Sequence, residues 1–321
     1  MPNKEYRPTL AQLRTFVTIA EHKHFGTAAA KLKISQPSLS QALLALESGL
    51  GVQLIERSTR KVIVTQRGQA VLPYAKAALE AADAFVAHAR GSEGTLGNPL
   101  TIGIIPTVAP YILPDLLREL REHYPIAQPR FVEEQTEHLL TQLREGQIDC
   151  AILATPVDAP GIETTELYTE PFVAITPAGH PLSGADQLQL DDLAQLELLL
   201  LDDGHCLRDQ VIDLCKLAGI AESTAAQSVT RAASLTTVVQ LVVAGMGSTL
   251  LPQSAVGAEC SRPSLAVIPF AEDAGAHRTI GLAHRASASR EEDYDALGQL
   301  VTSAYTSALE AARSATLASQ L

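Results

Sequence analysis

The sequence predicts a small module built of helices, followed by a larger module in which strands alternate with helices. Three observations lead to this fold class. Apolar residues recur every three or four positions over about the first 90 of the 321 residues. Beyond Asn98, short apolar runs alternate with amphipathic segments, which favours a mostly parallel α/β sheet. The net charge changes sign between the modules: residues 1–97 carry +5 and the remaining residues carry −17, which together give the −12 of the whole chain.

Composition excludes several classes of protein. With 46% apolar and 19% charged residues, the chain can form packed cores and is not predicted to be disordered. Neither a membrane-spanning apolar run nor a secretory signal is evident, so we expect a cytoplasmic protein without membrane contact. In that reducing compartment, four cysteines do not predict a disulfide framework. We also expect no cofactor and no bound metal.

The first module begins with two helices separated by a tight turn. Thr27 is placed to N-cap a short helix ending at Leu32, and Ser35 is placed to N-cap the next, with Pro37 tolerated in its first turn. This is a helix-turn-helix pattern, in which the second helix reads base edges in the major groove of DNA. A plain solvated polar face is the competing interpretation. The candidate base-reading residues are Ser35, Gln36, Pro37, Ser38, Ser40 and Gln41.

A cationic strand pair follows and favours the DNA-binding interpretation. Residues 54–65 predict a two-stranded wing that carries Arg57, Arg60 and Lys61, which suit backbone phosphates beside the groove. We therefore expect phosphate contacts from this local positive charge, although the chain as a whole is acidic.

Three stretches of this module match a known pattern. They are Phe25-Gly26-Thr27-Ala28-Ala29, the run Ser35-Gln36-Pro37-Ser38-Leu39-Ser40 with Leu46-Glu47, and Arg57-x-x-Arg60 followed by Thr65-x-x-Gly68. They resemble the winged helix-turn-helix of LysR-type transcriptional regulators. The resemblance implies that residues 1–65 form a domain that binds double-stranded promoter DNA, with RNA polymerase as a further partner.

Residues 66–97 predict a linker. An Ala-rich helix continues to Arg90, is bent at Pro73 and has an apolar seam that nothing nearby in the sequence covers. Pairing with a second copy would bury the seam, whereas a helix packed on its own domain would need no partner. The Gly- and Ser-rich stretch 91–97 then reads as a hinge.

Residues 98–321 form the predicted α/β module, whose expected elements include a strand over 172–176 and helices over 207–217 and 235–243. Such sheets bind ligands at the carboxyl ends of their strands, so a sensor, a solute-binding domain and an enzyme all remain open at this point. The LysR-type resemblance implies two lobes like those of periplasmic binding proteins, with crossings near Glu170 and Ala271. Lobe I would comprise about 98–170 and 271–321, and lobe II about 171–270.

Cys206 stands where a predicted strand ends and a helix begins. The partial positive charge of the helix N-terminus, with His205 and Arg208, predicts a lowered pKa and a reactive thiolate. Low-pKa thiolates react with peroxide to give a sulfenic acid, which condenses with a second thiol such as Cys215. If residues 206–215 stay helical, the two cysteines lie about 13.5 Å apart along the axis, too far for a disulfide. Oxidation would then unwind the helix; two inert buried cysteines are the alternative.

The segment Asp203-Gly204-His205-Cys206-Leu207-Arg208-Asp209-Gln210, followed by Cys215, resembles the redox segment of the peroxide-sensing LysR-type regulators, and the resemblance extends over nearly the whole chain. It implies a homotetrameric sensor of hydrogen peroxide, a dimer of dimers, that governs catalase, peroxide-defence and iron-homeostasis genes. A thiol reductant of the thioredoxin or glutaredoxin type would reset it. The implied roles are peroxidatic for Cys206, resolving for Cys215, and peroxide-pocket for Thr107, Thr136, His205, Arg208, Asp209 and Arg278.

Two other functions remain to be distinguished from this one. A LysR-type regulator of a small organic effector would carry these cysteines incidentally. A thiol peroxidase would use Cys206 for turnover, but would leave the basic module without a purpose. Cys150 falls in a predicted strand as a packing residue, and Cys260 has no cysteine partner nearby in the sequence.

Overall fold

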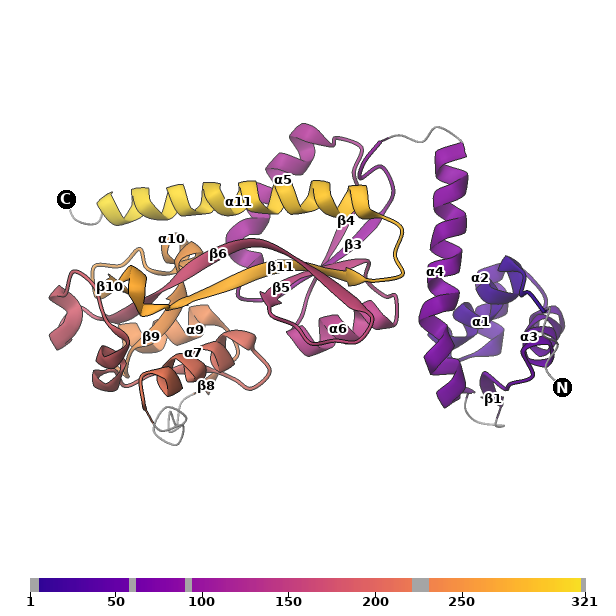
Figure 1. The fold of residues 1–321 in the computed structure, drawn as a ribbon, viewed down its shortest axis with the longest axis horizontal. Coiled ribbons are helices and arrows are strands. Elements are labelled where there is room, and N and C mark those ends of the chain that lie inside the picture. The colour runs from indigo at the N-terminus through magenta and orange to yellow at the C-terminus, as the bar shows by residue number, and fades with distance from the viewer. Residues whose placement is uncertain (1–5, 58–61, 90–93, 221–230, 319–321) are drawn as a thin grey trace. The chain divides into compact units, whose positions relative to one another are not determined.

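The computed structural model describes residues 6–57, 62–89, 94–220 and 231–318. These residues form two compact units: the first consists mainly of the residues up to Gly94, with the short segments Arg144–Gln147 and Ala286–Arg290, and the second of the rest of the chain from Thr95. Each unit is described by itself (Figure 1). None of the helices in the described ranges is long and apolar enough to cross a membrane.

The first unit has a helical core under a short strand pair. Phe16, Ile19, Leu39, Leu43 and Leu46 are among its fully buried side chains, and they recur at the three- and four-residue steps of amphipathic helices. The strand pair is antiparallel, with Ile55 opposite Val64. The elements are α1 (Leu10–His22), α2 (Phe25–Leu32), α3 (Gln36–Leu50), β1 (Ile55–Arg57), β2 (Val62–Val64) and α4 (Gln66–Ala89).

Caps set the ends of the two helices in the helix-turn-helix. Ser35 is the N-cap of α3, as the sequence predicts, and its hydroxyl accepts the N–H of Ser38 at 3.2 Å. The expectation for α2 was wrong: its N-cap is His24, whose Nδ1 accepts the N–H of Thr27 at 3.1 Å. An imidazole nitrogen can accept this bond as an Asp or Ser oxygen does, so Thr27 lies inside the helix. Lys33 closes α2 in the left-handed conformation, with φ of 56°.

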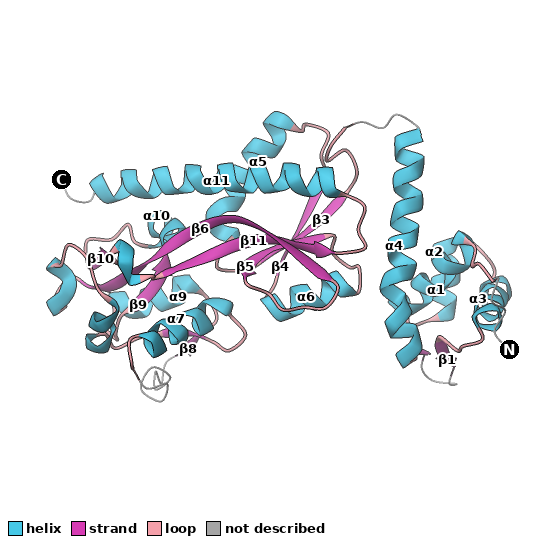
Figure 2. Cartoon of the chain, in the orientation of Figure 1, coloured by secondary structure: helices cyan, strands magenta, loops and turns pink. Residues whose placement is uncertain are grey.

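The second unit is a seven-stranded mixed sheet with helices packed around it (Figure 2). The strand order is β10-β6-β11-β5-β3-β4, with β9 also paired to β6. Its first elements are β3 (Leu100–Ile104), α5 (Ala109–His123), β4 (Pro129–Glu133), α6 (Thr136–Arg144), β5 (Cys150–Thr155) and β6 (Ile162–Pro177). They are followed by β7 (Leu200–Leu201), α7 (Cys206–Leu217), β8 (Arg231–Ala232), α9 (Leu235–Val243), β9 (Thr249–Pro252), α10 (Val256–Glu259), β10 (Leu265–Pro269), β11 (His277–Arg285) and α11 (Glu291–Ala318).

The long strand β6 runs through both halves of this sheet. Residues 162–171 pair with β11, and residues 172–177 pair with β9 and β10. The change of partners falls beside Glu170, where the resemblance placed the first crossing between lobes. In the half beyond the crossing, β7 and β8 form a separate parallel pair, and α7 and α9 pack with them around one apolar core. This half holds both cysteines of interest.

Candidate functional site

The exposed start of α3 carries the predicted base-reading side chains. Ser35, Gln36, Pro37, Ser38 and Gln41 are exposed, while Ser40 is half-buried. The Ser35 and Ser38 hydroxyls are 2.8 Å apart, so part of their hydrogen-bonding capacity is used in the cap. The amides of Gln36 and Gln41 have the donor and acceptor groups that read adenine in a major groove.

The wing is described in part. Arg57 ends β1, whereas Arg60 and Lys61 lie outside the described residues, so the predicted phosphate contacts stay predictions. Behind the wing, the Thr65 hydroxyl donates to the Gln53 carbonyl at 2.8 Å and accepts the N–H of Gly68 at 2.9 Å. These bonds join the second wing strand to the start of α4 and fix where the wing ends.

The seam of α4 divides into two parts. Val71, Ala75 and Leu79 pack on the core of the first unit, so this part of the seam is covered by its own domain. Farther along, Phe85 is 74% exposed and Val86 is 41% exposed. The competing interpretation, a helix packed on its own domain, therefore applies to the beginning of α4 and not to residues 85 and 86.

Cys206 is the first residue of α7, and it is half-buried. Gly204, with φ of +91°, makes the turn that leads into the helix. The positive φ favours glycine at this position, whereas the nearest neighbour of an added Cβ would be the flexible end of the Gln135 side chain, which could move aside. The Gln135 side-chain amide in turn donates to the Asp203 carbonyl at 3.5 Å.

Burial overturns the predicted acidity of Cys206. Removal from water raises the pKa of this thiol, and Asp209 raises it further. The Arg278 guanidinium, the Thr136 hydroxyl and the Leu207 backbone N–H act to lower the pKa, but do not overcome the effect of burial. The prediction of a low pKa was wrong because the sequence shows nearby charges and the helix start, but not the degree of burial.

The two cations that were expected to activate the thiol act differently. Burial lowers the pKa of His205, with Asp202 opposing this, so the imidazole is uncharged near neutral pH. Arg208 pairs with Asp203 at 3.1 Å. The cation that acts on Cys206 is instead Arg278, which is 72 residues further along the chain.

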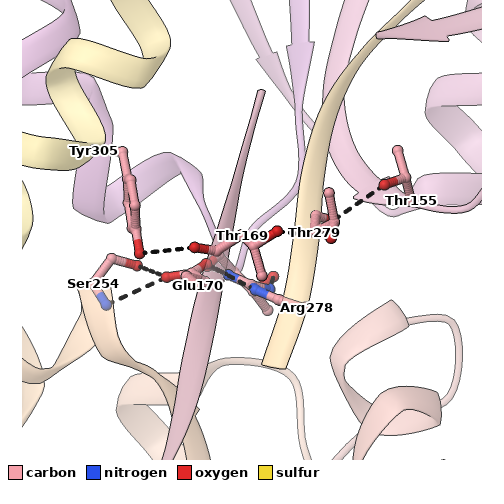
Figure 3. Close-up of polar contacts among 8 residues, drawn as sticks. Thr155, Thr169, Glu170, Ser254, Arg278, Thr279 and Tyr305 are labelled. Atoms are coloured by element: carbon pink, nitrogen blue, oxygen red, sulfur yellow. Dashed lines mark hydrogen bonds and ion pairs between the residues drawn. The ribbon is translucent and has the colours of Figure 1, made fainter. Parts of the chain in front are cut away.

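Arg278 is fixed by buried hydrogen bonds to Thr107 and Glu170; Figure 3 shows the part of this network formed by Arg278, Glu170 and Ser254. Its Nη1 donates to the Thr107 hydroxyl and its Nη2 to the Thr107 carbonyl, both at 2.9 Å. Nε and Nη2 donate to Glu170 Oε1 at 2.8 and 2.6 Å. The Ser254 hydroxyl donates to the other oxygen of Glu170 at 2.7 Å. Glu170 and Ser254 are site residues that the sequence analysis did not find.

The structure thus links three of the predicted pocket residues, Thr107, Thr136 and Arg278, to one another or to Cys206. Thr107 bonds to Arg278, and both Arg278 and Thr136 act on Cys206. The Thr136 hydroxyl is buried and has no partner with full hydrogen-bond geometry in the described part of the chain. His205 and Arg208 neighbour Cys206 without such a link, and Asp209 is exposed.

Cys215 lies on the same helix as Cys206, in the core of the second lobe. It is 1% exposed, and burial raises its pKa. All four cysteines are free thiols. Because α7 is continuous from 206 to 217, nine residues of helix separate the two sulfur-bearing positions by about 13.5 Å along the axis, well beyond the Cα separation of about 7 Å that a disulfide allows.

The other two cysteines lie elsewhere. Cys150 is a buried residue of β5, paired in register with His284 of β11. Cys260 follows α10, and burial, then Glu259, raises its pKa to about 12. No group of three or more metal-ligating side chains is found in the ranges that the structure describes.

Two family models match the chain. Residues 10–69 match the bacterial regulatory helix-turn-helix protein of the lysR family, and residues 93–305 match the LysR substrate binding domain. Among curated proteins, a probable hydrogen peroxide-inducible genes activator of Mycobacterium leprae is 51% identical, over 94% of this chain and 96% of that protein. The dual regulator OxyR of Escherichia coli is 37% identical, over 91% and 94%.

Solved structures agree with these relatives. A cysteine-to-serine variant of Corynebacterium glutamicum OxyR, with hydrogen peroxide bound, is 57% identical over 97% of both chains, with a TM-score of 0.70. A full-length OxyR variant of Pseudomonas aeruginosa is 33% identical over 92% of this chain and 98% of that one, with a TM-score of 0.77. The chain therefore belongs to the LysR family of transcriptional regulators, and within it to the OxyR group of hydrogen peroxide-inducible genes activators.

Proposed function

We propose that this chain is a DNA-binding transcriptional regulator that senses hydrogen peroxide through Cys206 and Cys215 and controls genes of peroxide defence, among them catalase and iron-homeostasis genes. The observation that carries the proposal is the position of both cysteines on α7. One lies at the polar start of the helix and the other is buried in the core, too far apart to bond while the helix is intact. Joining them must therefore change the fold of this lobe.

The chemistry takes place in two steps. The Cys206 thiolate attacks one oxygen of hydrogen peroxide, the O–O bond breaks, and water leaves after the second oxygen takes up a proton. The Cys215 thiol then attacks the sulfur of the Cys206 sulfenic acid, forming the disulfide and releasing a second water molecule. A dithiol reductant of the thioredoxin or glutaredoxin type would then reduce the disulfide to two thiols and become a disulfide itself.

The pocket residues suit a small, neutral, hydrogen-bonding ligand. The buried Thr136 hydroxyl, which lacks a partner of full geometry in the described part of the chain, is available to orient peroxide beside the thiol. Arg278, held by Thr107, supplies positive charge for the thiolate and the departing hydroxide. His205, Arg208 and Asp209 shape the entrance of the site in this proposal.

DNA recognition belongs to the first unit. Ser35, Gln36, Pro37, Ser38, Ser40 and Gln41 would face base edges, while Arg57, Arg60 and Lys61 contact phosphates. We assign residues 1–65 to DNA binding, 66–97 to dimerisation and 98–321 to sensing, in a cytoplasmic homotetramer that acts on RNA polymerase at promoters. The exposed apolar residues of α4 support association between copies.

A thiol titration tests the redox proposal. The full-length reduced protein receives one equivalent of hydrogen peroxide, and free thiols are counted before and after. We expect the native protein to lose two thiols. Cys206→Ser should lose none to a disulfide, and Cys150→Ser should lose two, as the native protein does. Retention of all four thiols, or the same loss in Cys206→Ser, refutes peroxide sensing by this pair.

A further inference from the structure

Glu170 is a buried carboxylate that pairs with Arg278, the cation that acts on Cys206. It lies on β6, where that strand exchanges β11 for β9 and β10 as its partners. Its side chain and that of Arg278 are both 0% exposed. One oxygen accepts two N–H groups of Arg278, and the other accepts the Ser254 hydroxyl. The carboxylate is therefore held on both sides, and its charge is directed at Arg278.

When Cys206 is a thiolate, the Arg278 guanidinium interacts with two anions, the thiolate and the Glu170 carboxylate. The guanidinium pairs with Glu170 at 2.6 Å and lies within electrostatic reach of the Cys206 sulfur. The Thr107 hydroxyl and carbonyl occupy further N–H groups. A guanidinium that is already neutralised by a carboxylate stabilises a second anion less, and this effect is strongest where water is excluded.

We propose that Glu170 is a positioning residue that holds Arg278 in place and competes with the Cys206 thiolate for its positive charge, thereby setting the peroxide concentration at which the sensor responds. This inference rests on the proposed function and extends it. The carboxylate keeps Arg278 beside the thiol and at the same time limits how strongly Arg278 favours the thiolate. On this proposal, Glu170 preserves the position of Arg278 and lowers the reactivity of the Cys206 thiol.

The other charged and titratable groups near these side chains do not replace Glu170. Asp209, on the same helix as Cys206, faces the thiol. Tyr168 of β6 and Tyr111 of α5 face Arg278. Burial raises the pKa of both tyrosines, so they are uncharged near neutral pH and the Arg278 guanidinium has Glu170 as its paired anion.

Glu170→Gln in the full-length reduced protein tests the competition, because it keeps the shape and removes the charge. The readout is the pH profile of iodoacetamide alkylation at Cys206, followed by peptide mass spectrometry. We expect the midpoint to fall by about one pH unit or more. Peroxide oxidation at pH 7 should then accelerate about three- to fourfold, since a tenfold gain in thiolate outweighs the lower nucleophilicity of each thiolate.

Two further variants separate competition from a purely structural role. Glu170→Asp keeps the charge on a shorter side chain, so its midpoint should lie between those of the native protein and Glu170→Gln. Glu259→Gln is the matched control: this carboxylate accepts bonds from Tyr111 and Thr236 in the same unit and should leave the Cys206 midpoint unchanged. If Glu170→Gln does not fold, as judged by circular dichroism, Glu170→Asp carries the test alone.

An unchanged or raised midpoint in a folded Glu170→Gln or Glu170→Asp overturns the inference. The alkylation profile is measured without peroxide, so it tests the competition even if the native protein keeps its thiols on oxidation. Retention of the thiols by the native protein after peroxide treatment would refute the proposed function, but not the electrostatic relation between Glu170, Arg278 and Cys206.

Discussion

Arg278 is a fully buried cation, and its anionic and hydrogen-bonding partners offset the cost of removing its charge from water. Burial alone would lower the pKa of Arg278, but Glu170, and after it Cys206 and Tyr168, raise the pKa above its ordinary value. A buried pair is expensive to break, because the remaining partner keeps its desolvation cost without its counter-charge. The same residue therefore pairs with Glu170 beside the lobe crossing and acts to lower the pKa of the Cys206 thiol.

Arg278→Met should accordingly lower the free energy of unfolding of the second unit by about 3–5 kcal/mol, because Glu170 would be left buried and unpaired. Urea denaturation of the reduced protein, followed by circular dichroism, measures this loss. Arg118→Met is the matched control, since Arg118 pairs with Asp115 at 2.6 Å but is 61% exposed; we expect less than about 1 kcal/mol there. Equal losses in the two variants would show that the buried pair contributes nothing special.

At this scale, sequence reasoning found residues with a local motif and missed those without one. Cys206 and Cys215 stand in a recognisable segment, and Arg278 came from the resemblance. Glu170 is a charged residue within a strand, and only its pairing with Arg278, 108 positions away, distinguishes it from a surface carboxylate. The pKa of Cys206 was misjudged for a related reason: burial is a property of the folded chain.

Among the elements, α7 is the helix that must unwind for the proposed disulfide to form. Its residues Leu207, Val211, Ile212 and Leu214 pack into the same core as Cys215. Disulfide formation must break helical hydrogen bonds between the cysteines, because their Cα atoms have to come within about 7 Å of each other. The cost of this disruption opposes disulfide formation, and the S–S bond must supply the compensating free energy.

Hydrogen exchange measures the fate of α7 directly. After peroxide treatment, the amides of residues 208–214 should exchange about tenfold faster or more, because they lose their helical bonds. Helix α9, which packs in the same core, provides an internal reference, and Cys206→Ser should keep its α7 protection after the same treatment. Unchanged protection in a protein that has lost two thiols would show that the cysteines bond by another route.

The elements also show where periodicity is informative. The predicted helices at 207–217 and 235–243 agree with α7 and α9 to within one residue, because apolar side chains recur on one face of each. The strand β6 was predicted over 172–176 alone, yet it begins at Ile162. Its first half exposes residues 163–166 to solvent, so the segment lacks the apolar run that marked the buried half.

At the scale of the whole molecule, net charge was a poor guide and its distribution a good one. The total of −12 conceals the basic first module, which carries +5, and the DNA-binding family match falls on residues 10–69. The proposed pairing of copies would be a further property of the whole molecule, beyond those of each unit. We propose that one contact forms at the exposed part of α4, where the adjacent apolar residues Phe85 and Val86 are both exposed.

Phe85→Glu should weaken this association. A carboxylate at a residue that is 74% exposed in one copy costs that copy little, but burying it between two helices is unfavourable unless it is paired. Analytical ultracentrifugation of the reduced protein without DNA should show a native tetramer and a variant that sediments as smaller species. Ile63→Glu, a similarly exposed apolar site at 49% on the wing strand β2, should leave the tetramer intact. A tetramer in Phe85→Glu would place the contact between copies elsewhere, and with it the assignment of residues 66–97 to dimerisation would fail.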